Sequence, residues 1–108
     1  MKTMYKQKIL EELKALLMGK YFRDIDRVIL FGSRIDGTAH EHSDYDILII
    51  LNHDYDWRFS REIQGVCWEV DYKFDILTDV KIISLNELNT LRGKQPFILN
   101  ALENGVIL

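Results

Sequence analysis

The run Ile47-Leu48-Ile49-Ile50-Leu51 limits the possible folds of this chain more than any other segment. Five consecutive aliphatic residues leave no polar face, so residues 45–51 predict a β-strand that is buried on both sides. A second β-rich run at 27–31 is stopped by Gly32, and a third occupies residues 74–83. We expect these runs to form one small sheet that packs against helices.

Helical periodicity occurs before the first of these strands and again between the second and the third. Residues 4–17 carry apolar side chains at spacings of three and four, which predicts an amphipathic helix that ends at Gly19. A second helix is predicted over residues 57–72, with Asp56 as its N-terminal cap. Trp68 occurs at helical spacing in this segment, and we expect it to be packed.

The C-terminal third of the chain predicts two shorter helices. Ser84 and Glu87 form a capping-box signature for a short helix that continues to about Leu91. Pro96 opens a last helix, which residues 104–105 stop before an apolar tail. The order of elements therefore predicts an α/β (α+β) fold with a small mixed sheet packed against helices.

The chain length is sufficient for one domain, which we expect to span residues 1–108. Its 108 residues, 47% of them hydrophobic, can bury a modest core without disulfides or a structural metal. Cys67 is the single cysteine, so we expect it to pack in the core of a protein from a reducing compartment. The charged N-terminal segment lacks the apolar run of a signal peptide, which predicts a cytoplasmic protein with no membrane contact.

The charge distribution excludes a general nucleic-acid-binding surface. The net charge is −3 and the isoelectric point is about 5.5, whereas counterion release requires a dense basic face. Residues 1–34 hold eight Lys and Arg against four acids, and residues 35–108 hold six against thirteen. This segregation is compatible with ordinary solvated surfaces, and also with an acidic metal site beside a basic phosphate site.

Two short motifs flank the loop between the first and second strands. Gly32-Ser33 follows the first strand, where backbone N–H groups and a hydroxyl can face an anion, although such a pair alone is typical of an ordinary turn. Asp44 and Asp46 open the second strand, and the period of two places both carboxylates on one face about 7 Å apart. A role for Asp44 as a strand-entry cap would leave Asp46 unexplained. Neighbouring carboxylates repel unless a cation lies between them, and oxygen ligands suit Mg²⁺.

These motifs, Gly32-Ser33, ten intervening residues and Asp44-x-Asp46, resemble the signature of the minimal nucleotidyltransferases of the DNA polymerase beta-like superfamily. The segment Gly32-Ser33-Arg34 resembles the glycine-serine-arginine turn of that family. The resemblance implies the nucleotidyltransferase fold and a third carboxylate on the next strand. Asp75 and Asp79 share parity there, as would Asp71 if the strand began earlier. We favour Asp79, which lies inside the β-rich run beside apolar Val80, and we keep Asp75 as the alternative.

The resemblance also implies a reaction, the transfer of AMP from ATP to a hydroxyl group of a macromolecular acceptor. Asp44, Asp46 and Asp79 would be the catalytic, metal-binding carboxylates for one or two Mg²⁺ ions. Gly32 and Ser33 would bind the β- and γ-phosphates of ATP. Arg34 is a weaker candidate for phosphate contact, because it could instead pair with a surface acid.

Relatives of this size resemble the antitoxin half of HEPN/MNT toxin–antitoxin pairs, in which the antitoxin adenylylates a tyrosine of a helical HEPN-type toxin. A protein partner of this type is therefore expected, in a homo- or hetero-oligomer that the sequence does not specify. The alternative is a catalytically inactive binding module that acts by occluding its partner. A third interpretation, an antibiotic-modifying nucleotidyltransferase, would require a separate substrate domain for which the chain is too short.

Overall fold

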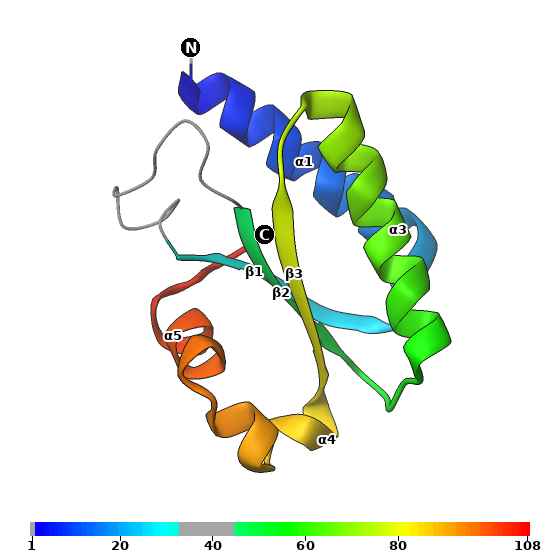
Figure 1. The fold of residues 1–108 in the computed structure, drawn as a ribbon, viewed down its shortest axis with the longest axis vertical. Coiled ribbons are helices and arrows are strands. Elements are labelled where there is room, and N and C mark those ends of the chain that lie inside the picture. The colour runs from blue at the N-terminus through cyan, green and yellow to red at the C-terminus, as the bar shows by residue number, and fades with distance from the viewer. Residues whose placement is uncertain (1, 33–44) are drawn as a thin grey trace.

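The computed structural model of the chain describes residues 2–32 and 45–108, and the side chains of residues 6–32 and 45–108. Helix α1 (Lys2–Tyr21) precedes strand β1 (Ile25–Phe31), and strand β2 (Tyr45–Leu51) precedes helix α3 (Trp57–Phe74) and strand β3 (Thr78–Ser84). Then follow helix α4 (Leu85–Leu88), the 3₁₀ helix η1 (Leu91–Lys94), helix α5 (Pro96–Asn104) and the short strand β4 (Val106–Ile107) (Figure 1). Within the described residues, no helix is long and apolar enough to cross a membrane.

The described strands form one mixed sheet of four strands in the order β3-β2-β1-β4, which confirms the predicted fold class. Strand β1 is antiparallel to both β2 and β4, whereas β2 and β3 are parallel. A parallel pair requires a crossover connection, and α3 provides it. The apolar tail contributes β4, a strand that the sequence analysis does not assign.

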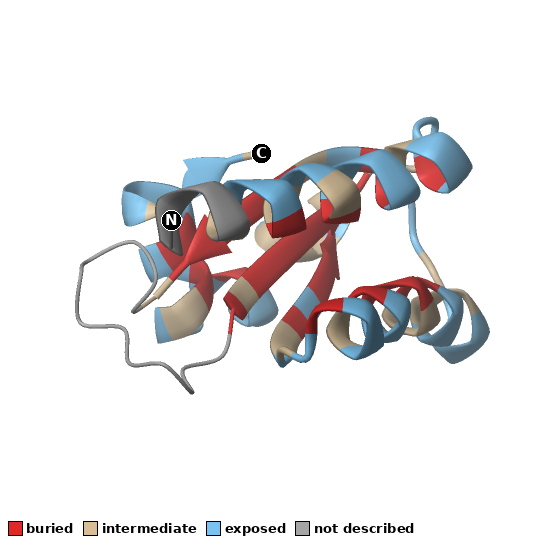
Figure 2. Cartoon of the chain, turned by 90° about the horizontal axis from the view of Figure 1, so that it is seen from above, coloured by how far each residue is buried: buried red, intermediate tan, exposed pale blue. Residues whose placement is uncertain are grey.

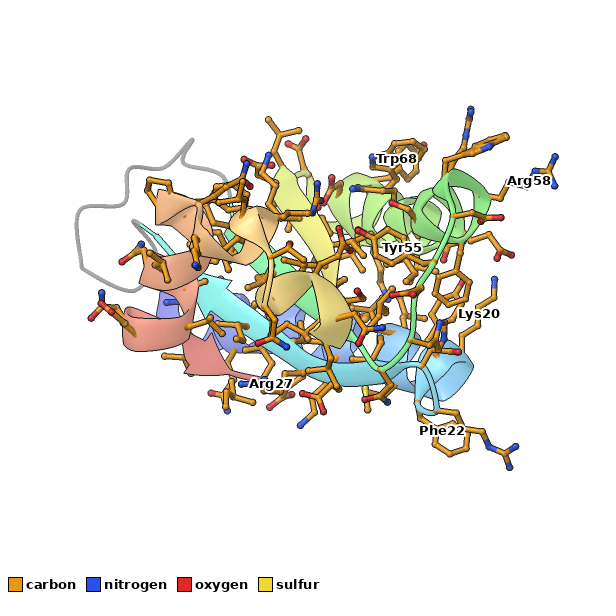
Figure 3. The ribbon with its side chains drawn as sticks, turned by 90° about the horizontal axis from the view of Figure 1, so that it is seen from below. Lys20, Phe22, Arg27, Tyr55, Arg58 and Trp68 are labelled. Carbon is orange, nitrogen blue, oxygen red and sulfur yellow. The ribbon has the colours of Figure 1, made fainter. Side chains whose placement is uncertain are left out.

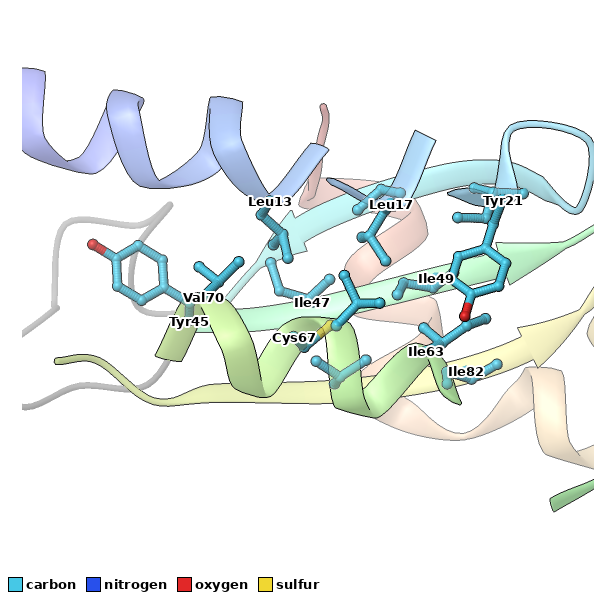
Figure 4. Packing of buried hydrophobic residues seen from close by; sticks show 14 of the residues in the cluster. Leu13, Leu17, Tyr21, Tyr45, Ile47, Ile49, Ile63, Cys67, Val70 and Ile82 are labelled. Atoms are coloured by element: carbon cyan, nitrogen blue, oxygen red, sulfur yellow. The ribbon is translucent and has the colours of Figure 1, made fainter. Parts of the chain in front are cut away.

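Helices cover both faces of the sheet, as the buried run 47–51 requires. Helices α1 and α3 lie on one face, and the larger hydrophobic cluster there joins Leu17 and Cys67 to Ile47 of β2 (Figure 4). Helix α5 lies on the opposite face, where Ile98 packs with Leu48. Buried residues are therefore concentrated in the strands and on the sides of the helices that face them (Figure 2).

The capping residues predicted from the sequence end or begin their helices as expected. The Asp56 side chain accepts a hydrogen bond from the backbone N–H of Phe59 at 3.0 Å, and this caps α3. The capping box between Ser84 and Glu87 is present in α4. Pro96 occupies the first turn of α5, and these local signals agree with the observed element order.

Four predicted features differ from the structure. Helix α1 continues past Gly19 to Tyr21, which is only 4% exposed. A glycine destabilises a helix by only about 1 kcal/mol, whereas burial of the Tyr21 side chain stabilises the fold by more than that. The third strand begins at Thr78, since α3 extends to Phe74. The predicted helix that continued to Leu91 is instead α4 followed by η1. Trp68 is 56% exposed, so its predicted packing is wrong.

Candidate functional site

The backbone turn after β1 brings Gly32 against the second acidic motif. Phe31, the last residue of β1, lies opposite Asp46 in the antiparallel pair of β1 and β2. Gly32 has φ +80°, a conformation that favours glycine, and a Cβ added there would lie 2.2 Å from Oδ2 of Asp46. The Asp46 carboxylate thus lies against the Gly32 backbone, where only a residue without a side chain fits.

Two acidic residues lie side by side on adjacent strands. Asp46 of β2 and Asp79 of β3 are direct partners in the parallel register. Adjacent strands are about 4.8 Å apart, so the two residues begin from neighbouring backbone positions. Leu48 follows Asp46 by two positions and Ile83 follows Asp79 by four, so each acid lies on the same face of the sheet as these residues. This is the face that α5 covers. The two acids therefore share one face, beside the Gly32 turn.

A lysine accompanies this acid pair. The Nζ atom of Lys81 lies 3.3 Å from Oδ1 of Asp79. The same ammonium group lies 5.7 Å from the ring centroid of Phe97, at the start of α5. Sequence reasoning missed Lys81, although its parity with Asp79 along β3 was available as a signal. Lys81 brings positive charge to one edge of the acid pair.

The two alternative third carboxylates lie off the strand. Asp75 is the C-terminal cap of α3, in the left-handed conformation with φ 53°. Asp71 lies within α3, where its Oδ1 accepts a hydrogen bond from the Thr78 hydroxyl at 2.8 Å. Neither residue shares the strand position of Asp79, and this placement favours Asp79 as the partner of Asp46.

Three predicted site residues, Ser33, Arg34 and Asp44, lie outside the described residues. Among residues 2–32 and 45–108, no three His, Cys, Asp or Glu side chains gather as a metal-binding group. The described carboxylates, Asp46 and Asp79, are oxygen donors on one sheet face, which is the chemistry that Mg²⁺ prefers. These residues fit a Mg²⁺ site that takes further ligands from elsewhere, as Mg²⁺ does when it binds through one or two carboxylates and substrate phosphates.

The one cysteine does not contribute a nucleophile. Cys67 lies on the side of α3 that packs against the other face of the sheet, where it is fully buried, and burial raises the pKa of its thiol to about 12. A thiol in this state is protonated and shielded from solvent. Cys67 is therefore a core residue and not part of the candidate site.

A mixed sheet with a glycine turn packed against one of two in-register acids is the arrangement that the resemblance to the nucleotidyltransferases predicts. The family model described as "Polymerase beta, Nucleotidyltransferase" matches residues 11–108, so the chain belongs to this family.

Two proteins from Methanocaldococcus jannaschii are similar in sequence. "Putative protein adenylyltransferase MJ0604" is 31% identical over 105 residues, which cover 97% of this chain and 99% of that protein. "Putative protein adenylyltransferase MJ1305" is 32% identical over 90 residues, which cover 77% of this chain and 61% of that protein.

Solved structures with the same fold come from toxin–antitoxin complexes. A toxin–antitoxin structure with AMP-PNP matches with a TM-score of 0.60 and 22% identity, over 90% of this chain and 69% of that chain. A mutant of the toxin–antitoxin MntA-HpeT matches with a TM-score of 0.56 and 20% identity, over 94% of this chain and 69% of that chain. At these identities the similarity supports the fold.

Proposed function

We propose that this nucleotidyltransferase uses Mg²⁺ to transfer AMP from ATP to a hydroxyl group of a protein. The observation that carries the proposal is the pairing of Asp46 with Asp79 in register, with the Gly32 backbone packed against the Asp46 carboxylate. The similar proteins described as protein adenylyltransferases support the choice of AMP and of a protein acceptor.

In the proposed reaction, the oxygen of the acceptor hydroxyl attacks the α-phosphorus of ATP. The bond from that phosphorus to the bridging oxygen breaks, pyrophosphate leaves with the electron pair, and the hydroxyl proton is lost. Bound Mg²⁺ supplies neutralisation of the triphosphate and of the leaving pyrophosphate. The role of the protein is to position these groups and to balance their charge.

Each proposed site residue has one task. Asp44 and Asp46 hold the metal, and Asp79 either completes the metal site or receives the hydroxyl proton. Ser33 and the backbone at Gly32 bind the β- and γ-phosphates.

Two basic residues supplement this set. Arg34 contacts phosphate. Lys81 keeps the Asp79 carboxylate in position and balances its charge before the metal binds, since its ammonium group lies 3.3 Å from that carboxylate.

The proposed acceptor is a helical HEPN-type toxin, for which this chain would be the antitoxin. The fold is shared with chains of toxin–antitoxin complexes, and this supports a protein partner. A second candidate function is a binding module that neutralises its partner by occlusion alone. The presence of both Asp46 and Asp79 on one sheet face favours the enzyme.

Calorimetric titration of ATP into the protein, with Mg²⁺ and with EDTA, tests the site. We expect binding that requires Mg²⁺ and is lost in the Asp46→Asn and Asp79→Asn variants. Asp75→Asn is the matched control, because it removes the same charge at a helix cap whose left-handed conformation asparagine tolerates. Loss of binding in the control and its retention in Asp79→Asn would reverse the assignment of the third carboxylate.

Transfer is tested by incubating the candidate toxin with labelled ATP and the protein. We expect label on a hydroxyl-bearing residue of the toxin and loss of toxin activity. If the Asp46→Asn variant leaves the toxin unlabelled but still neutralises it, the occlusion alternative is correct.

A further inference from the structure

The outer side of α3 carries large side chains that remain exposed. Trp68 is 56% exposed and Tyr72 is 92% exposed, and both project from the helix side that faces away from the sheet. Arg58 and Arg61, within the first two turns of the same helix, are also exposed. Figure 3 shows Arg58 and Trp68 on this helix. Trp, Tyr and Arg are the residue types enriched in protein interfaces.

These residues form one continuous stripe. Arg58, Arg61, Gly65, Trp68 and Tyr72 are separated by three or four positions, so they follow a single line along α3. The residues that bury α3 against the sheet, such as Ile63 and Cys67, lie on the opposite side of the helix. We call this line, from Arg58 to Tyr72, the α3 stripe.

Gly65, at the centre of the α3 stripe, has no internal packing reason to be glycine. A Cβ added at Gly65 would meet nothing within 4 Å, so alanine would fit the chain without change. Glycine lowers the stability of a helix interior relative to alanine. A glycine at this position would let a second helix approach closely, as small residues allow at helix crossings.

The chemistry of the α3 stripe is complementary to itself when one copy is reversed. Its arginines, Arg58 and Arg61, precede Gly65, whereas Tyr72 and the exposed Glu69 follow it. An antiparallel crossing at Gly65 places Arg58 opposite Tyr72 and Arg61 opposite Glu69 of the second copy. A parallel crossing would instead bring like side chains together, arginine against arginine.

We propose that two copies of this chain associate through the α3 stripe, as an antiparallel, two-fold symmetric helix pair centred on Gly65. Such an interface is self-complementary, and each contact occurs twice. Arginine over tyrosine and arginine beside glutamate then supply the polar contacts around the glycine crossing. One helix face buries less area than a standard interface, so the dimer is weak and depends on concentration.

This association leaves the candidate active site accessible. Asp46 and Asp79 lie on the sheet face that α5 covers, whereas α3 covers the other face. The dimer therefore does not require the proposed reaction, and it does not block either copy of the site.

Sedimentation equilibrium over a range of protein concentrations tests the proposal. We expect the apparent mass of the wild-type chain to rise from 12.8 kDa towards twice that value. The Gly65→Leu variant blocks the close crossing while leucine favours the helix, so it should fold and remain monomeric. A wild-type chain that stays monomeric, or a Gly65→Leu variant that dimerises like wild type, would overturn the proposal.

Charge reversal tests the antiparallel orientation. Arg61→Glu alone sets two carboxylates opposite each other, and Glu69→Arg alone sets two cations opposite each other, so each should weaken dimerisation by about tenfold or more. An equal mixture of the two single variants restores both pairs, and we expect it to dimerise. Lys94→Glu on η1 is the control for the charge change and should leave dimerisation unaltered. A mixture that remains monomeric would refute the antiparallel pairing.

Discussion

Replacement of Gly32 by alanine is the most direct test of how the backbone supports the acid pair. The added Cβ would lie 2.2 Å from Oδ2 of Asp46, whereas ordinary contacts of a Cβ begin at 3.4 Å. The carboxylate therefore has to move by about 1 Å, and a displacement of this size at a reacting centre can lower activity by about 100-fold. The φ of +80° at Gly32 also strains alanine by about 1–2 kcal/mol.

Two measurements separate these effects. Thermal unfolding of Gly32→Ala should show a midpoint lower by about 5–10 °C, which corresponds to the strain for a chain of this size. Titration with Mg²⁺ and ATP, at a temperature where the variant is folded, should show weakened binding, and the rate of AMP transfer should fall by about 100-fold.

Gly19→Ala is the matched control, because a Cβ at Gly19 in α1 would meet nothing within 4 Å. This control should raise the free energy of unfolding by about 1 kcal/mol and leave ATP binding unaltered. If Gly32→Ala binds Mg²⁺ and ATP as wild type does, the close packing of Gly32 against Asp46 has no role in the site.

Three further variants probe charge and burial. Lys81→Met should bind Mn²⁺ more tightly in the absence of nucleotide, because the acid pair loses its neighbouring ammonium group. Electron paramagnetic resonance measures the free Mn²⁺, and weaker binding in the variant would contradict this charge balance. The Asp54 carbonyl and the Asp24 carboxylate raise the pKa of His53 above 6.5, so the free energy of unfolding of the wild type should fall as pH rises above about 6.5 towards the raised pKa. Urea unfolding at several pH values should show this fall in the wild type and not in His53→Gln. The buried Tyr21 hydroxyl has no hydrogen-bond partner among the described atoms, so Tyr21→Phe should raise the free energy of unfolding by up to about 1 kcal/mol in the same assay. A clearly destabilised variant would mean that the hydroxyl makes a hydrogen bond in the folded protein.

Local chemistry in the sequence was sufficient to predict most element ends. Asp56 and Ser84 form caps through bonds to backbone N–H groups three residues away, and such bonds depend on short segments alone. The buried run 47–51 likewise predicted a strand covered on both faces. The end of α1 was mispredicted, because burial of Tyr21 depends on the tertiary packing of α1 on the sheet and outweighs the local preference at Gly19.

The candidate site was only partly predictable for a related reason. Parity along the third strand could not distinguish Asp79 from Asp75, because the choice depends on where α3 ends. The parity of Lys81 with Asp79 along β3 could have placed Lys81 on the same face, but the register that brings Asp46 beside Asp79 joins residues far apart in the sequence. Trp68 was assigned to the core because it occurs at helical spacing, but it lies on the side of α3 opposite to the apolar face that Ile63 and Cys67 define.

The proposed nucleotide site and the proposed dimer interface lie on opposite sides of the sheet, so single variants can test them independently. The carboxylates of Asp46 and Asp79 belong to the α5 side, while Gly65 lies on the outer surface of α3 beyond the other side. No residue of the α3 stripe is proposed to contact ATP, and sites without shared contacts are expected to be energetically independent. Gly65→Leu should therefore bind Mg²⁺ and ATP like wild type although it is monomeric, and Asp46→Asn should dimerise like wild type although it does not bind ATP. Loss of both properties in either variant would mean that dimerisation and nucleotide binding are coupled through the sheet.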